Sequence, residues 1–152
     1  MPETKEKREI TEELFLGEIY KNAKMGADSI INLLPHVKED SLRSVMTMQL
    51  DGYEKYAARA AEALCKMGLE AKEENIITRF SARIGVAINT MIDSTASHIA
   101  EMMIEGSNMG VTDMTKLLNS QGPRGACKEA TRLAREIIAF EEHNLEMLKR
   151  YL

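Results

Sequence analysis

Three ionisable residues in this sequence have the types and spacing to bind a metal ion. His98 precedes Glu101 by three positions, and Glu141 precedes Asn144 by the same step. Residues three or four apart share one face of a helix, so side chains from adjacent turns can reach one ion. His98, Glu101 and Glu141 are therefore candidate ligands of a metal site, with iron or manganese as its cofactor. The simpler interpretation is a hydrogen-bonded core histidine and two glutamates on solvated helix edges, with no cofactor.

Uncharged polar residues fall at the same helical spacing. Gln49 and Tyr53 are four positions apart, and Asn144 lies one turn beyond Glu141. Unpaired polar groups are costly on a core-facing surface, so these side chains need partners. They predict a polar layer that fixes the register of packed helices, as buried amides do in coiled coils. The chain shows no Ser–His–Asp order, no glycine-rich phosphate loop and no zinc spacing, so we name no catalytic residue.

The eleven methionines are candidates for a second kind of role. Most fall on helical faces, where a flexible thioether fills irregular gaps in a core. The alternative is an adaptable protein-interaction surface over residues 102–114, where Met102, Met103 and Met109 surround two glycines. Packing is the interpretation we favour.

Charge and cysteine content exclude several classes of partner. Lys and Arg number 20 against 24 Asp and Glu, giving a net charge of −4 with both signs interspersed, which disfavours nucleic acid. No apolar run approaches the ~20 residues of a membrane span, and the charged N-terminus lacks a secretory signal. Cys65 and Cys127 are far apart and outside any CxxC motif, which predicts free thiols in a reducing cytoplasm.

Long helices must position all of these residues. Apolar residues recur at three- and four-residue steps over 8–34 and over about 40–67, and Pro35 and Gly68 are expected to end these two helices. The period resumes over 76–105, either as one long helix or as two pieces.

The C-terminal third contains a predicted break. Gly106–Gly110 is a weak point for a helix, and Thr112 can cap a short extra helix through Leu118. A loop then precedes a final helix from about Ala126 to the C-terminus. Long helices with brief connections predict an all-α four-helix bundle, with an extra short helix or kink before the last helix.

The domain organisation follows from this pattern. A chain of 152 residues suits one domain of ordinary size. We expect a disordered tail over residues 1–7 and a single four-helix-bundle domain over residues 8–152.

Three segments of the chain resemble ferritin-like proteins, in particular a small bacterial branch with tandem long helices. The resemblance covers most of the chain and rests on spacing and residue size within IYKNAKMGADSIINLLPHVKEDSLRSVMTMQLDGYEKYAARAAEAL, SHIAEMMIEGSNMGVTDMTKLLN and ATRLAREIIAFEEHNLEMLKRYL. It implies that residues 76–93 form a crossover and that the third bundle helix begins near Ser94.

The metal motifs of that family are not intact here. Metal-binding relatives carry Glu-x-x-His on two helices, whereas this chain has Gln49 followed by Gly52, and Glu141 followed by Asn144. Neutral amides do not balance the charge of two metal ions. The resemblance therefore predicts the fold without a standard di-metal centre.

We accordingly expect a cytoplasmic, homodimeric binding or structural module without catalytic activity. The first alternative is a metal-binding oxidoreductase or iron-handling protein with a modified site at His98, Glu101 and Glu141. The second alternative is a Met-rich interaction scaffold.

Overall fold

The computed structural model describes residues 10–72, 85–89, 95–121 and 127–152. These residues are helical apart from turns and short connections, and none of them forms a strand. The predicted tail, residues 1–7, lies outside the described part, as does the start of the predicted period at Ile76. The all-α class is confirmed.

The first two long helices end where the sequence predicts. Helix α1 spans Glu12–Leu33, and the Thr11 side chain caps it by accepting a hydrogen bond from the backbone N–H of Leu14. Pro35 lies in the 3-10 turn η1, Leu34–His36, that follows. Helix α2 spans Asp40–Lys66. Gly68 follows it with φ 76°, the left-handed conformation that favours glycine after a helix.

Helix α4 corrects one prediction and decides another. It spans Ala96–Asn119 without interruption, so the break at Gly106–Gly110 and the separate short helix before the last helix are wrong. Thr95 caps its start by accepting a hydrogen bond from the His98 backbone N–H. Residues 85–89 form a separate helical segment, so the region up to residue 105 is not one helix. The last helix, α5, spans Lys128–Leu148 and continues as η2, Lys149–Tyr151.

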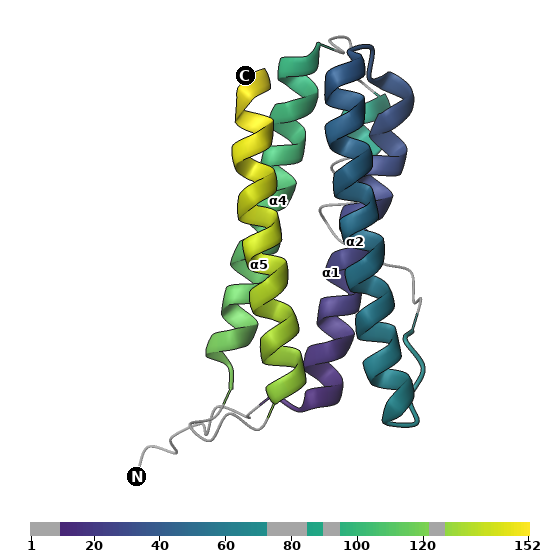
Figure 1. Cartoon of the computed structure of the whole chain (residues 1–152), viewed down its shortest axis with the longest axis vertical. Coiled ribbons are helices and arrows are strands. Elements are labelled where there is room, and N and C mark those ends of the chain that lie inside the picture. The colour runs from purple at the N-terminus through teal and green to yellow at the C-terminus, as the bar shows by residue number, and fades with distance from the viewer. Residues whose placement is uncertain (1–9, 73–84, 90–94, 122–126) are drawn as a thin grey trace.

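The four long helices lie side by side, as Figure 1 shows. Helices α1 and α2 form one antiparallel pair, and α4 and α5 form the other. Helix α2 also packs on α5, and α1 on α4. Because α2 and α4 run in the same direction, the connection between them joins opposite ends of the assembly. Each pair is therefore local in sequence, and one long connection separates the pairs.

The apolar core is divided into two clusters along the helix axes. One contains Phe15, Leu16 and Ile19 of α1 with Leu133 and Ile137 of α5. The other is formed by residues nearer the opposite end, including Ile30, Leu33, Leu42, Met46, Ile99 and Leu148. On α4 and α5, buried polar residues lie between the members of the two clusters: Ser107 on α4, and Glu141 and Asn144 on α5.

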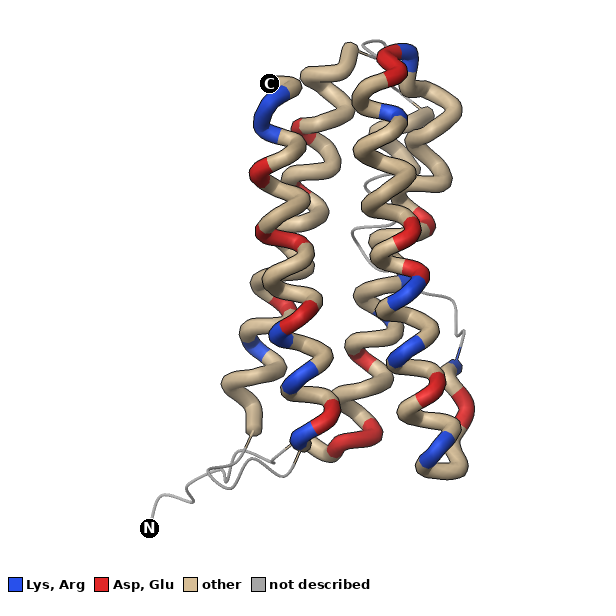
Figure 2. Tube along the Cα trace, viewed as in Figure 1, with Lys and Arg blue, Asp and Glu red and all other residues tan. Residues whose placement is uncertain are grey.

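The surface shows no segregation of charge in the described part of the chain. Acidic and basic residues are interleaved along the helices (Figure 2). None of the described helices combines the length and apolar character that crossing a membrane requires. Cys65 and Cys127 are not joined by a disulfide, as predicted, and the Cys127 thiol donates to the Ile10 carbonyl.

Candidate functional site

A layer of buried polar side chains lies at mid-height, and every long helix contributes to it. These side chains are 8% exposed or less. They are Asn22 and Ser29 of α1, Gln49 of α2, Ser107 of α4, and Glu141 and Asn144 of α5. Tyr53 of α2, 3% exposed, extends into the same layer. Burial of Gln49, Tyr53 and Asn144 agrees with the predicted polar layer, and the structure adds Glu141 to it.

The centre of the layer is a contact between Tyr53 and Glu141. The Tyr53 hydroxyl donates to Glu141 Oε1 at 3.0 Å. The other carboxyl oxygen, Oε2, is buried and has no hydrogen-bond partner among the described residues. Asn144 and Ser107 lie close enough to the phenol to lower its pKa, although burial and Glu141 together raise the pKa of Tyr53 well above its ordinary value.

Glu141 is the only carboxylate in the layer, and its charge is disfavoured there. Loss of solvent, with a smaller contribution from the repulsion of Asp113, raises its pKa to about 8. The hydrogen bond from Tyr53 acts in the opposite direction. At neutral pH the side chain is therefore mostly a neutral carboxylic acid.

Three glycines make room for the aromatic and acidic side chains of this region. An ideal Cβ at Gly110 would lie 2.2 Å from Glu141 Oε1, and one at Gly26 would lie 2.5 Å from the Tyr53 ring. A Cβ at Gly52 would lie 2.3 Å from the Phe140 ring, which packs edge-on against Tyr53 with centroids 5.0 Å apart. Any residue with a Cβ atom at one of these three positions would overlap the neighbouring Glu141, Tyr53 or Phe140 side chain. Each glycine is therefore needed for close packing.

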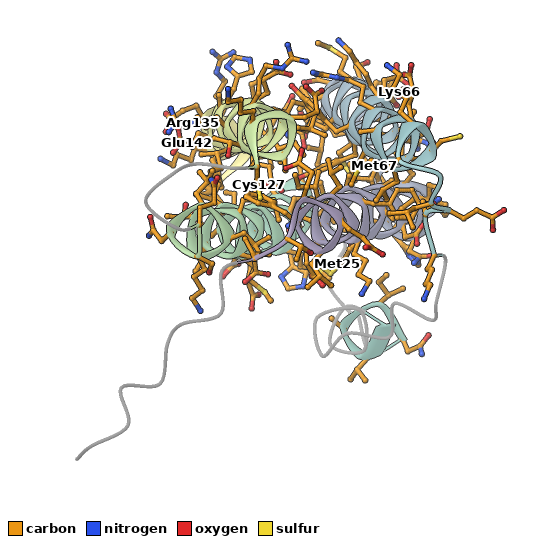
Figure 3. The ribbon with its side chains drawn as sticks, turned by 90° about the horizontal axis from the view of Figure 1, so that it is seen from below. Met25, Lys66, Met67, Cys127, Arg135 and Glu142 are labelled. Atoms are coloured by element: carbon orange, nitrogen blue, oxygen red, sulfur yellow. The ribbon has the colours of Figure 1, made fainter. Side chains whose placement is uncertain are left out.

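A small cavity adjoins this contact between α1 and α4. It offers about 20 Å³ to the centre of a water-sized molecule, enough for one such group. Its lining includes Asn22, Tyr53, Ser107 and Glu141, and the apolar part of the lining is Met25, Gly26, Met102, Met103, Gly106 and Gly110. Figure 3 looks along the helices and shows Met25 on the side of α1 that faces away from α2 and α5.

The structure separates the three predicted metal ligands. Glu101 is exposed, His98 is half-buried, and Glu141 is buried against Gly110. At 1.5 Å per residue, Gly110 lies roughly 13 Å along α4 from Glu101 and roughly 18 Å from His98. In the described part of the chain, no group of three or more His, Cys, Asp or Glu residues is placed to hold a metal ion. Of the three, only Glu141 lies in the site.

Asn22, Ser107 and the glycines are site residues that the sequence analysis did not identify. Ser107 and Gly110 lie at helical spacing from Met103 and Met114, which are buried on the same face of α4. That spacing, which continues through the presumed weak point, was a usable signal. Asn22 lies next to buried Ala23 in α1.

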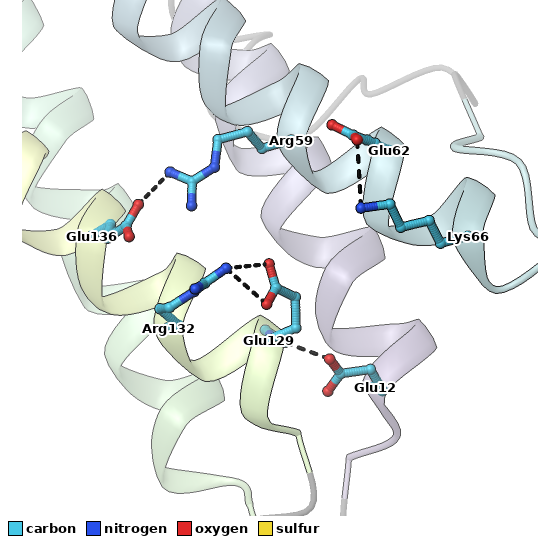
Figure 4. Close-up of polar contacts among 8 residues, drawn as sticks. Glu12, Arg59, Glu62, Lys66, Glu129, Arg132 and Glu136 are labelled. Atoms are coloured by element: carbon cyan, nitrogen blue, oxygen red, sulfur yellow. Dashed lines mark hydrogen bonds and ion pairs between the residues drawn. The ribbon is translucent and has the colours of Figure 1, made fainter.

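A second concave region lies between the ends of α2 and α5 (Figure 4). It is a groove of about 740 Å³ with four basic residues, of which three have acidic partners. Arg59 contacts Glu136, and Arg132 forms hydrogen bonds of 2.9 and 3.0 Å to Glu129. Exposed ion pairs of this kind contribute roughly 0–1 kcal/mol to the stability of the fold. They also neutralise three of the four basic residues of the groove without a bound ligand.

The Tyr53 hydroxyl can be tested separately from its ring. Tyr53→Phe leaves Glu141 Oε1 buried without a donor, so the unfolding free energy is expected to fall by about 1–2 kcal/mol. The pKa of Glu141 will also rise, because this hydrogen bond lowers it. Urea denaturation and carboxyl-carbon NMR measure the two effects. The control is Tyr56→Phe, since Tyr56 packs on the same Phe140 ring. Equal effects of the two substitutions would contradict the assigned contact.

The chain matches no family model, no curated protein and no solved structure. Its function has to be inferred from the geometry of the polar layer.

Proposed function

We propose that the chain is a ferritin-like four-helix bundle whose polar layer is a small-ligand binding site rather than a di-metal centre. Two antiparallel helix pairs joined by one long connection are the connectivity of ferritin-like folds. The polar layer occupies the position between helices at which such bundles build their cofactor sites.

The unpaired polar atoms of the layer carry the proposal of ligand binding. Glu141 Oε2, Asn22 Oδ1 and both amide atoms of Gln49 are buried without hydrogen-bond partners among the described residues. Leaving such a group unpaired costs roughly 1–3 kcal/mol, and groups of this kind call for an explanation. A small polar molecule bound in the adjoining cavity would supply partners to Glu141 and Asn22, which both line it.

The donor set of the layer does not fit two metal ions. Di-metal sites in bundles use four carboxylates and two imidazoles. This layer contains one carboxylate, three amides and three hydroxyls from its seven side chains. The pKa of the single carboxylate, about 8, means that even this charge is mostly neutralised by a proton at pH 7. We therefore assign no redox or oxygen chemistry to the layer.

Metal analysis of protein purified without chelator tests this part of the proposal. We expect less than one equivalent of iron or manganese per chain, because one carboxylate cannot balance two divalent ions. Two equivalents per chain that are lost in Glu141→Gln would overturn the proposal. Metal retained equally by the wild type and by Glu141→Gln is bound outside the layer.

We also propose a homodimer in the cytoplasm as the setting of this activity. The lack of a disulfide between Cys65 and Cys127 is what a reducing compartment would give. Light scattering coupled to gel filtration measures the oligomeric state directly.

A further inference from the structure

We propose that the cavity between α1 and α4 binds the primary ammonium group of a small aliphatic amine, with the Glu141 carboxylate as its counter-charge. This inference rests on the proposed function and names the class of ligand.

The polar atoms around the cavity match a group that only donates hydrogen bonds. Glu141 Oε2 and Asn22 Oδ1 are unpartnered acceptors, and both residues line the cavity, one from α5 and the other from α1. Ser107 and Tyr53 add hydroxyl oxygens. An ammonium group has three donors and no acceptor, so it can pair with several of these oxygens together. A charge-assisted bond to the carboxylate is the strongest of them.

The size of the cavity selects among cations. About 20 Å³ accommodates one water-sized group. A terminal –NH₃⁺ has that size, whereas a quaternary ammonium or a guanidinium group is several times larger. Primary amines should therefore bind, and tetramethylammonium should not.

The remainder of the lining suits an aliphatic tail. Met25 and Met102 are half-buried, and together with Met103 they form the apolar side of the cavity. Methionine is flexible and adapts to aliphatic groups of different shape. Met25 and Asn22 also border an outer groove of about 380 Å³, whose charged residues are Glu18, Asp113, Lys21 and Lys116.

Binding of a cation must displace the proton of Glu141. The titratable and charged groups that act on this carboxyl are Tyr53 from α2 and Asp113 from α4. Because its pKa is about 8, the carboxylate is mostly protonated at lower pH and unable to neutralise a cation. Affinity for an amine should therefore rise about tenfold per pH unit up to about pH 8.

The experiment uses the full-length chain with ¹³C-labelled methionine methyl groups. n-Butylammonium chloride is added at about pH 8.5, where Glu141 is ionised. We expect concentration-dependent shifts of the Met25, Met102 and Met103 methyl signals. Met48 is 64% exposed on α2 and serves as the internal control, whose signal should not move. Tetramethylammonium chloride and sodium chloride at equal concentration should produce none of these shifts.

Two variants test whether the shifts of the methionine methyl signals depend on the proposed acceptors, Glu141 and Asn22. Glu141→Gln should weaken binding about tenfold or more, because it removes the charge but keeps the shape. The neighbouring exposed residue provides the matched control Glu142→Gln, which should bind as the wild type does. If Glu141→Gln does not fold, Asn22→Ala tests the second acceptor in the same way.

Several outcomes would overturn the inference. These are equal responses to n-butylammonium and tetramethylammonium, the same shifts with sodium chloride alone, or undiminished binding by Glu141→Gln. A chain that binds no amine and no pair of metal ions refutes this inference and leaves the proposed function standing. Two metal ions per chain that are lost in Glu141→Gln would refute the proposed function itself.

Discussion

Raising the pH from about 5 to about 9 will destabilise the protein, by an amount on the order of 4 kcal/mol from Glu141 alone. Burial raises the pKa of this carboxyl from 4.5 to about 8 in the folded protein. In the unfolded chain the group is solvated and titrates near its ordinary value. Between about pH 4.5 and about pH 8 the folded state therefore holds up to one proton more than the unfolded state.

The sign of the effect follows from this difference in bound protons. The stabilising contribution is fully present below about pH 4.5, decreases as the pH rises through about 8, and is flat above that. Tyr53 does not interfere, because its own pKa is raised well above 10.0. Most exposed carboxylates of globular proteins give the opposite slope at low pH.

Urea denaturation at several pH values, followed by circular dichroism, measures this slope. Glu141→Gln keeps a neutral hydrogen-bonding side chain and should remove most of it, so the variant should be more stable than the wild type at about pH 9. Glu142→Gln is the control at the adjacent, exposed position and should retain the slope. A wild-type stability that stays constant or rises over this range would contradict the buried, protonated state of Glu141.

Alanine at two of the glycines will destabilise the protein, although alanine favours helices. Gly26→Ala and Gly52→Ala should each lower the unfolding free energy by about 2–3 kcal/mol, near the top of the usual range for overpacking. The added carbon would lie 2.5 Å from the Tyr53 ring in the first case and 2.3 Å from the Phe140 ring in the second. These rings pack on each other, so neither can move without disturbing the Tyr53–Glu141 contact.

Gly17 provides the matched control for these substitutions. It also lies within α1, but no atom outside the helix backbone is within 4 Å of the position its Cβ would occupy. Gly17→Ala should therefore stabilise the protein by up to about 1 kcal/mol through helix propensity alone. Thermal and urea denaturation of the three variants will show whether the signs differ. Stabilisation by Gly26→Ala as large as that by Gly17→Ala would refute the close packing.

The helices were predictable wherever local signals decide the structure. Pro35 and Gly68 end helices because of their own backbone chemistry, and the apolar period identifies the buried faces. Gly106 and Gly110 misled the prediction, since glycine lowers helix propensity in isolation. In the folded chain the contact between Gly110 and Glu141 makes glycine the residue that fits within a continuous helix.

The candidate site was predictable only in part, because it depends on how the helices face one another. The spacing of Gln49, Tyr53 and Asn144 was sufficient to predict a polar layer. It was not sufficient to place His98 relative to Glu141, since helical periodicity fixes a face but not the height at which two helices meet. Asn22 is identified only by its position beside the cavity, whereas the helical spacing of Ser107 from Met103 and Met114 was already a usable signal.

The division into two helix pairs also has a consequence for the order of folding. Within each pair the contacts are close in sequence, and local contacts form quickly. Tyr53 and Glu141 belong to different pairs and are 88 residues apart, so their hydrogen bond can form only when the two pairs dock. That docking buries and dehydrates a carboxyl group. Protonation of that group should accelerate docking, which makes the folding rate, and not only the stability, dependent on acidity.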